Sequence, residues 1–437
     1  MTMASWDAVE TADRIRRGDV TAGEVLEAAI ARAEAAAQLG AVVVASFDRA
    51  RAGLAQLPAG ALSGVPTFVK DLSQVRGVPT AWGSAGSGAF VSRRSDPFVK
   101  RFERTGVVVL GKSATPELGL TATTEPLFAP PTRNPRDPSR SSGGSSGGAG
   151  ALVAAGVVPI AHGSDGGGSV RIPAACCGVV GFKPSRGRLD MEGSRLLPVN
   201  VACHGVLTRS LRDTIVFHQA IAGLGEVAGA PARPLRIGAF ADAPGGTPVD
   251  PDVRAAVAAA AKQCAALGHE VSEISCPFDE SVMDDFLAYW GFVAWIQVRS
   301  ARVTIHRGFD PTRVEPWTAG LIDTFKRDRR AVLAAIRRLR RFARSYARVM
   351  ERCDILLSPT TAHPAPPLGH LATDRFATHF ERLRAYAAFT PMANAAGAPA
   401  ISLPLGATAA GLPIGVHLAA RRGDDRTLLE LAQVLYA

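Results

Sequence analysis

The sequence predicts a mixed α/β fold in which a central twisted β-sheet is flanked by α-helices. Short apolar runs rich in valine and isoleucine alternate with longer segments whose apolar residues recur at helical spacing. Between residues 235 and 274 these segments follow one another as strand, helix and strand, the β-α-β unit of mixed α/β proteins. A chain of 437 residues that is 47% apolar can bury a large core. We therefore expect a single domain over residues 1–437.

The elements of the first half follow from apolar runs bounded by glycine, proline and polar residues. Helices are expected over residues 6–36 (a pair), 98–105 and 149–157. Strands are expected over residues 41–46, 64–71, 107–110, 157–161 and 179–184. The second helix of the first pair starts at a capping box formed by Thr21 and Glu24. Residues 126–141 are rich in proline and predict an irregular segment without a strand.

The second half continues the alternation. Helices are expected over residues 208–223, 250–267 and 425–436, and strands over residues 235–240, 270–274, 354–360, 391–404 and 411–418. Residues 280–325 are rich in tryptophan, tyrosine and phenylalanine. Two interpretations stay open for them: core packing of two helices, or the wall of a pocket for an apolar or aryl substrate.

The charge balance allows a nucleic-acid-binding interpretation but does not favour it. The formal net charge is +10, yet only six of the 49 basic residues are lysines and the arginines are scattered, with one dense patch at residues 329–348. Apolar residues recur there at helical spacing, so we expect an amphipathic helix with a basic solvated face rather than a nucleic-acid or membrane surface.

The chain begins without a signal-peptide pattern and has no run long enough to span a membrane. Six cysteines form no metal-ligand spacing. A cytoplasmic enzyme is expected.

Serine and glycine are concentrated between residues 142 and 171. Two serine clusters, Ser145-Ser146 and residues 164–169, flank an apolar segment. A flexible linker would share the glycine content, but its interior would be polar, and this one is apolar enough to belong to a core. The composition therefore favours a site built from hydroxyls and main-chain amides.

The second cluster has the pattern of an oxyanion hole. Three consecutive glycines precede a serine, which lets successive amides turn toward one point. The amides expected to form the hole are those of Gly166, Gly167, Gly168 and Ser169. Asp165 and Arg171 flank the loop and are expected to pair and hold its shape.

Two other motif matches point to different functions. Residues 106–113 satisfy the phosphate-loop pattern G-x-x-x-x-G-K-[ST], but its four central residues are apolar and predict a strand, whereas a phosphate loop follows a strand. Residues 143–147 satisfy G-x-S-x-G, which in α/β-hydrolases lies on a strand-to-helix turn. With an irregular segment in front and a second serine cluster behind, we consider that triad the weaker interpretation.

Two lysines are candidates for a general base. Lys70 ends the apolar strand expected over residues 64–71, and burial of a lysine lowers its pKa and makes a neutral amine available. Lys183 ends another apolar run and competes with it. A surface pair between Lys70 and Asp71 is the structural alternative.

Six segments resemble motifs of the amidase signature family of serine hydrolases, and the first three of them recur in order with the family's spacing. They are G-V-P-T-F-V-K-D (64–71), G-G-S-S-G-G (143–148), D-G-G-G-S-V-R-I-P (165–173), G-F-K-P-S-R-G-R (181–188), D-I-L-L-S-P-T (354–360) and G-L-P-I-G-V-H (411–417). The likeness covers nearly the whole chain and is weakest from about 225 to 350. It implies the α/β fold of that family, with a catalytic core at about 60–200 and a variable substrate-pocket region at about 280–350.

The resemblance also implies a Ser–cis-Ser–Lys triad. Ser169 would be the nucleophile, Ser145 the bridging serine after a cis peptide bond, and Lys70, rather than Lys183, the base. A neutral Lys70 would take the Ser169 proton through Ser145 and return it to the leaving amine. Supporting roles are expected for Ser146, Asp165 and Arg171, and a place in the substrate pocket for Gly119, Thr121, Trp290 and Trp295. No cofactor or metal is expected.

The substrate expectation rests on Gly166, where many members of the family have a larger residue. The D-G-G-G-S form resembles members that act on aryl amides, small linear or cyclic amides and carbamates, and is expected to leave more room beside the nucleophile. The alternative is a glutamine-hydrolysing amidotransferase subunit, but residues 199–205 lack the S-L-D-Q-like run of that subunit. We expect a small amide or carbamate as the partner, no nucleic acid or membrane, and a monomer or homodimer.

Overall fold

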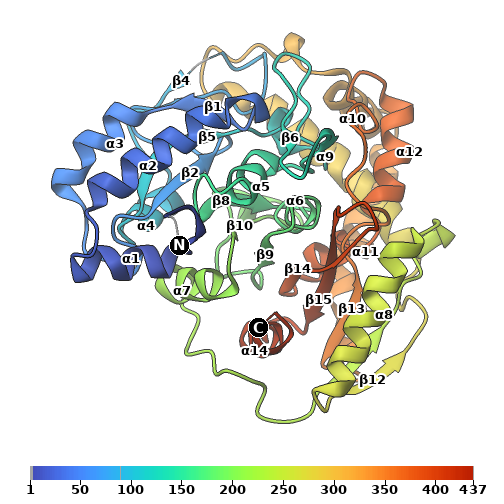
Figure 1. Cartoon of the computed structure of the whole chain (residues 1–437). Coiled ribbons are helices and arrows are strands. Elements are labelled where there is room, and N and C mark those ends of the chain that lie inside the picture. The colour runs from blue at the N-terminus through green and yellow to red at the C-terminus, as the bar shows by residue number, and fades with distance from the viewer. Residues whose placement is uncertain (1–2, 89, 437) are drawn as a thin grey trace.

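An eight-stranded sheet, in the order β12-β11-β13-β15-β14-β9-β10-β8, runs through the computed structural model, which describes residues 3–88 and 90–436 (Figure 1). Its strands are β8 (Ile160–Asp165), β9 (Val180–Lys183), β10 (Cys203–Thr208), β11 (Arg236–Ala239), β12 (Glu270–Glu273), β13 (Ile355–Pro359), β14 (Ala400–Ala407) and β15 (Pro413–Ala420). The pairs β11–β12 and β11–β13 are parallel and the remaining pairs are antiparallel. The predicted mixed α/β class is confirmed.

A second sheet has the order β1-β5-β2, from β1 (Val42–Ala45), β5 (Val108–Ser113) and β2 (Pro66–Lys70). It adjoins the large sheet where β2 lies beside β8. Side chains bridge this seam: Thr67 Oγ1 donates to the Ile160 carbonyl at 2.9 Å, and the Lys70 amide donates to His162 Nδ1 at 3.2 Å. Two small hairpins pair β3 (Pro79–Thr80) with β4 (Phe90–Val91) and β6 (Arg133–Asn134) with β7 (Asp137–Ser141).

Helices cover both sheets, and α5 and α6 lie at the centre of the molecule (Figure 1). The helices of the first half are α1 (Ala8–Arg17), α2 (Ala22–Ala35), α3 (Phe47–Gly53), α4 (Pro97–Glu103), α5 (Gly147–Ala154), α6 (Arg171–Cys177) and α7 (Leu211–Ala222). Those of the second half are α8 (Pro251–Ala266), α9 (Ser281–Thr304), α10 (Pro316–Arg327), α11 (Arg329–Val349), α12 (Phe376–Tyr386), α13 (Pro391–Ala396) and α14 (Asp425–Leu435). The capping box expected at Thr21 is formed.

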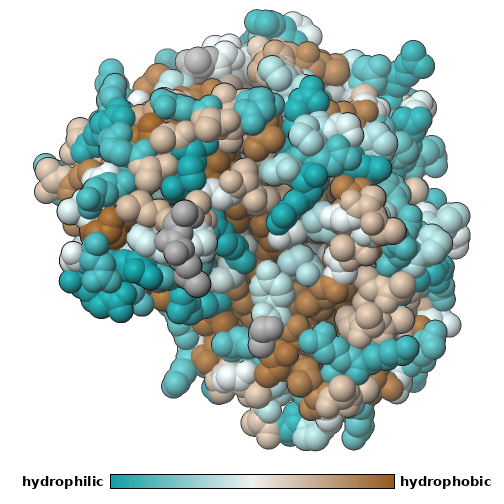
Figure 2. Space-filling model, viewed as in Figure 1, coloured by the Kyte–Doolittle hydropathy of each residue, from teal (hydrophilic) through white to brown (hydrophobic). Residues whose placement is uncertain are grey.

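The surface is polar where the arginine-rich helix meets solvent. In α11 the buried residues are Val332, Ala335, Ile336, Leu339 and Tyr346, so the predicted amphipathic helix is present. Leu333, placed by its spacing on the apolar face, is 56% exposed instead. Figure 2 shows teal and pale residues over most of the viewed face, with apolar ones in interrupted groups. Among the described helices, none combines the length and apolar character that a membrane crossing requires.

Four sequence expectations about the elements need correction. Residues 391–404 were expected to form a strand, but residues 391–396 form helix α13 and strand β14 begins only at Ala400. The strand expected over 157–161 is β8, so residues 162–165 belong to a buried strand and not to a loop. The proline-rich segment contains β7, which ends directly before the first serine cluster. The strand β10 was not predicted, because its histidine and glycine break the apolar run, although both of its faces are buried. The division into a catalytic core and a pocket region stays a prediction.

Candidate active site

Lys70 is the fully buried end of strand β2 and lies among three hydroxyl groups. Its Nζ is 2.7 Å from Ser145 Oγ, 3.0 Å from Ser146 Oγ and 3.0 Å from Ser164 Oγ. Burial lowers the pKa of Lys70 to about 7, a shift that the carboxylate of Asp165 partly opposes. A lysine with this pKa is in large part a neutral amine at neutral pH. It can then accept a proton from one of the hydroxyls.

The backbone around Ser145 leaves no room for larger residues. The peptide bond between Gly144 and Ser145 is cis, as the family resemblance implies. A Cβ on Gly144 would lie 2.3 Å from the carbonyl oxygen of Thr123, so only glycine fits. Gly119 has a φ of +69°, and a Cβ there would approach Ser145 Oγ to 3.3 Å. The two glycines let main chain pass close to the Ser145 hydroxyl.

The two serine clusters are joined directly. The amide of Ser146 donates to the carbonyl of Ser169 at 3.2 Å. The Ser146 hydroxyl donates to the Ser164 carbonyl at 3.2 Å and accepts from the Ser164 amide, also at 3.2 Å. Ser146 therefore ties strand β8 to the first cluster and carries one of the hydroxyls around Lys70. The sequence placed Ser164 in the second serine cluster but predicted no contact with Lys70, since a serine inside a strand has no local signal of this role.

Ser169 follows the glycine loop and is partly exposed to a cavity that Ser145 also lines. Among the described residues its hydroxyl has no hydrogen-bond partner. Of the contacts that the expected triad requires, the one between Lys70 and Ser145 is formed, and one between the hydroxyls of Ser145 and Ser169 is not. An unbonded hydroxyl on the cavity wall is available to a substrate.

The glycine loop, residues 166–168, is held by the ion pair predicted between Asp165 and Arg171. Asp165 and Arg171 are fully buried, and Arg171 Nη2 lies 2.9 Å from Asp165 Oδ1. Burial raises the pKa of Asp165, but the guanidinium of Arg171 more than offsets this, and the net pKa lies below its ordinary value. Asn394 donates to Asp165 Oδ1 at 2.9 Å and accepts from Arg171 Nη2 at 2.6 Å. Asn394 was missed because it lies more than two hundred residues away along the chain.

One of the four amides expected in the oxyanion hole has another partner. The Gly168 amide donates to Asp165 Oδ1 at 2.8 Å, so Asp165 uses this amide to shape the loop. Gly168 has a φ of +126°, and a Cβ there would lie 2.2 Å from Thr390 Oγ1. The amides that remain candidates for an oxyanion are those of Gly166, Gly167 and Ser169.

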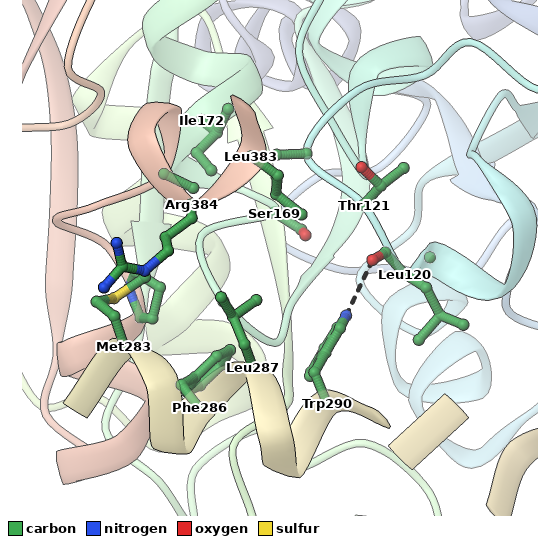
Figure 3. A pocket seen from close by; sticks show the side chains of 15 residues that line it. Leu120, Thr121, Ser169, Ile172, Met283, Phe286, Leu287, Trp290, Leu383 and Arg384 are labelled. Carbon is green, nitrogen blue, oxygen red and sulfur yellow. Dashed lines mark hydrogen bonds between the residues drawn. The ribbon is translucent and has the colours of Figure 1, made fainter. Parts of the chain in front are cut away.

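Two cavities meet at Ser169. The larger has a volume of about 610 Å³ and reaches from Ser145 and Ser164 to the side of α9. The smaller, of about 50 Å³, is walled by side chains of α9 and α12 (Figure 3). Gly119, Trp290 and Ser169 line both, and Thr121 lines the smaller one. Figure 3 shows the hydroxyl of Ser169 facing the loop at Leu120 and Thr121.

Trp290 is fixed beside Ser169. Its Nε1 donates to the Leu120 carbonyl at 2.9 Å, the bond drawn in Figure 3, and Trp317 Nε1 donates to the same oxygen at 3.0 Å. Trp295 faces elsewhere and packs against Phe325, with ring centroids 4.9 Å apart. Five positions along a helix turn the side chain by about 140°, which is why only one of these two tryptophans of α9 reaches the cavities. The expected pocket role of Trp295 is thereby corrected.

Aromatic rings of α9 pack closely against Gly166 and Gly167. A Cβ on Gly166 would lie 2.9 Å from Trp290 Cη2, and one on Gly167 would lie 3.2 Å from Phe286 Cε1. The absence of side chains on these glycines therefore lets aromatic rings of α9 approach the loop closely. Gly166 also lines the larger cavity and Gly167 the smaller one, so the room for substrate expected from the D-G-G-G-S form stays a prediction.

The competing motifs do not converge on the serines. Lys183 is buried, and its Nζ donates to the Pro184 carbonyl at 2.8 Å. Lys112 of the phosphate-loop pattern lies inside strand β5 and forms a buried ion pair of 2.9 Å with Asp71. Asp71 thus pairs with Lys112, which excludes the surface pair between Lys70 and Asp71. Within residues 3–88 and 90–436, no three His, Cys, Asp or Glu side chains are grouped to hold a metal.

Comparison with known proteins identifies relatives along the whole chain. The profile of the family described as Amidase matches residues 24–429. The chain is 43% identical over 443 residues to a protein of Mycobacterium tuberculosis strain H37Rv, provisionally assigned as the amidase AmiC, covering 98% of this chain and 93% of the relative. The structure of a 6-aminohexanoate cyclic dimer hydrolase superposes with a TM-score of 0.91 at 32% identity, covering 100% of this chain and 97% of that one. A bacterial aryl acylamidase of the amidase signature family superposes with a TM-score of 0.86 at 26% identity, covering 98% and 95%.

Proposed function

This chain belongs to the amidase signature family, and from that premise we propose that it is a serine hydrolase that cleaves small amides through an acyl-enzyme on Ser169. The observation that carries the proposal is the 2.7 Å contact between Lys70 Nζ and Ser145 Oγ in a fully buried setting. Neutral Lys70 takes the proton of Ser145, and Ser145 takes that of Ser169 as the latter attacks the carbonyl carbon. This step requires the Ser169 hydroxyl to turn toward Ser145 across their shared cavity.

The tetrahedral intermediate carries a negative oxygen, and the amides of Gly166, Gly167 and Ser169 are proposed to stabilise it. Losing one donor of an oxyanion hole typically costs about 3–4 kcal/mol of transition-state stabilisation. Collapse of the intermediate expels the amine, which receives the proton from Lys70 through Ser145. Water then attacks the acyl-enzyme by the same path. The network of Asp165, Arg171 and Asn394 supports this proposal because it holds the loop rigid.

The substrates we propose are small amides with an apolar or aryl group beside the scissile bond, with carbamates and esters as further candidates. Apolar side chains of α9 line the cavities next to Ser169, among them Phe286, Leu287 and Trp290. Relatives that act on 6-aminohexanoate cyclic dimer or on aryl acylamides support this choice of substrate class.

The test is a hydrolysis screen of the purified protein across anilides, aliphatic amides, carbamates and glutamine, with Ser169→Ala as the matched variant. We expect turnover of anilides or other apolar amides by the wild-type protein, and no turnover above background by Ser169→Ala at an unchanged melting temperature. Turnover of glutamine alone, or substantial activity of the Ser169→Ala variant, would refute the proposal.

A further inference from the structure

A series of hydrogen bonds begins at the main-chain amide of Lys70 and ends on the carboxylate of Glu192, which lines the larger cavity. The main-chain amide of Lys70 donates to His162 Nδ1 at 3.2 Å. His162 Nε2 lies 3.1 Å from His204 Nδ1, and His204 Nε2 lies 2.7 Å from Glu192 Oε2. Both imidazoles are buried, and the ring of Phe98 packs on both of them, with centroids 4.1 Å from His204 and 4.6 Å from His162.

The donor at one end of this hydrogen-bond series and the acceptor at the other fix the direction of every hydrogen bond in it. A main-chain N–H of Lys70 can only donate, so His162 Nδ1 accepts and the ring carries its proton on Nε2. That proton is donated to His204 Nδ1, which leaves the proton of His204 on Nε2, facing the carboxylate of Glu192. An additional proton on either imidazole would set two N–H groups against each other. Burial also lowers the pKa of His162 well below its ordinary value, so the neutral ring of His162 adds no positive charge beside Lys70.

The position of His162 explains what the chain accomplishes. Along β8, His162 and Ser164 are two residues apart and project to the same face, which meets the edge strand β2. His162 binds the main chain of Lys70, and Ser164 binds its Nζ at 3.0 Å. Strand β8 therefore binds Lys70 at its main-chain amide and at its side-chain amine. Between β8 and β2, these side-chain hydrogen bonds stand where main-chain hydrogen bonds would join two strands of one sheet. The register of this seam sets the distance from Lys70 Nζ to Ser145.

We propose that His162 is a positioning residue for the base: together with His204 and Glu192 it forms a one-directional hydrogen-bond chain that holds the main chain of Lys70 in register with the serine hydroxyls. The effect on catalysis rests on the proposed function. The tautomers of the two imidazole rings follow from the hydrogen-bond geometry alone.

Two substitutions distinguish the loss of the hydrogen-bond acceptor at Nδ1 from the loss of the imidazole ring itself. In His162→Asn the amide oxygen can take the place of Nδ1 and accept from Lys70, whereas in His162→Gln the amide group reaches the place of Nε2 instead. We expect His162→Asn to keep kcat within about threefold, and His162→Gln to lower kcat by about 10-fold to 100-fold with KM nearly unchanged, as displacement of a catalytic group does. His269→Gln is the control, because His269 Nδ1 also accepts a main-chain N–H, that of Leu235 at 3.3 Å, just outside strands β11 and β12. It should alter the melting temperature only.

A second measurement is independent of turnover. Nitrogen NMR of the protein with labelled histidine should show His162 protonated on Nε2 and unprotonated on Nδ1 from about pH 6 to 9, across the usual titration range of imidazole. Equal kcat for His162→Asn and His162→Gln, or losses in both that follow their melting temperatures, would overturn the positioning role. A proton on Nδ1 would overturn the chain itself. If the wild-type protein hydrolyses no amide, the proposed function fails, and the ring protonation still decides whether the chain exists.

Discussion

Gly166 and Trp290 fit together as a pair: a Cβ on residue 166 would lie 2.9 Å from Cη2 of the tryptophan ring. The ring is held by the Leu120 carbonyl and lies between the two cavities that meet at Ser169. Gly166, three residues before Ser169, therefore determines how closely helix α9 approaches the loop. The walls of the cavities beside Ser169 come from two segments that lie more than one hundred residues apart.

Gly166→Ala is expected to lower kcat/KM for an anilide by about tenfold, because overpacking a rigid contact costs about 1–3 kcal/mol. The backbone at residue 166 lies outside the left-handed region, so alanine itself brings no conformational strain. Adding Trp290→Leu to Gly166→Ala should restore part of the activity, and steady-state kinetics of the two single variants and the double variant measure the coupling. Additive losses would show that the ring and the loop act independently.

The pH dependence of the reaction should follow Lys70. Its folded-state pKa is lowered to about 7, chiefly by burial, and only the neutral amine is a base. We expect kcat/KM to rise with pH and to level off above about 7, in a profile measured with a substrate that does not ionise. The free energy of unfolding should increase as the pH rises from about 7 to 10.5, the ordinary pKa of lysine. In that range Lys70 binds a proton in the unfolded chain more often than in the folded one. A flat profile from acid to alkaline pH would exclude Lys70 as the base.

Substituting each buried lysine in turn identifies the base. Lys70→Met should lower kcat by about 10²–10⁴-fold, the usual contribution of a general base. Lys183→Met should leave most of the activity, because Lys183 Nζ donates to the carbonyl of Pro184. The measurement is kcat for an anilide, with circular dichroism to confirm that each variant is folded. A larger loss in the Lys183 variant than in the Lys70 variant would reverse the assignment.

Asp165→Asn should destabilise the protein strongly. Arg171 is fully buried, and removing the charge of its partner leaves a guanidinium uncompensated, which costs about 3–5 kcal/mol. Urea unfolding measures the loss, and activity should fall with it because the carboxylate also accepts the amides of Gly168 and Val170. Val170, with an apolar side chain, contributes only its main chain to this network. A stable and active Asp165→Asn variant would show that the loop keeps its shape without the pair.

The fold class and the central residues of the site were predictable because their signals are local. Apolar runs predict strands, and the run that ends on Lys70 predicts a buried lysine. Gly-Ser clusters predict close main-chain approach. The contacts of Ser164, His162 and Asn394 had no such signal, because their partners lie on segments far away in the sequence that only the tertiary structure brings together.

The sequence by itself determined which chemical groups are available: a lysine in an apolar run, serines among glycines, and an aspartate and an arginine that flank the loop. The tertiary structure decided which groups meet. It brought Lys70, and not Lys183, to the hydroxyl of Ser145, assigned the Gly168 amide to Asp165, and packed the ring of Trp290 against Gly166. The reason is physical: burial and hydrogen-bond geometry are properties of packed neighbours, and these neighbours come from strands and helices that are distant in sequence.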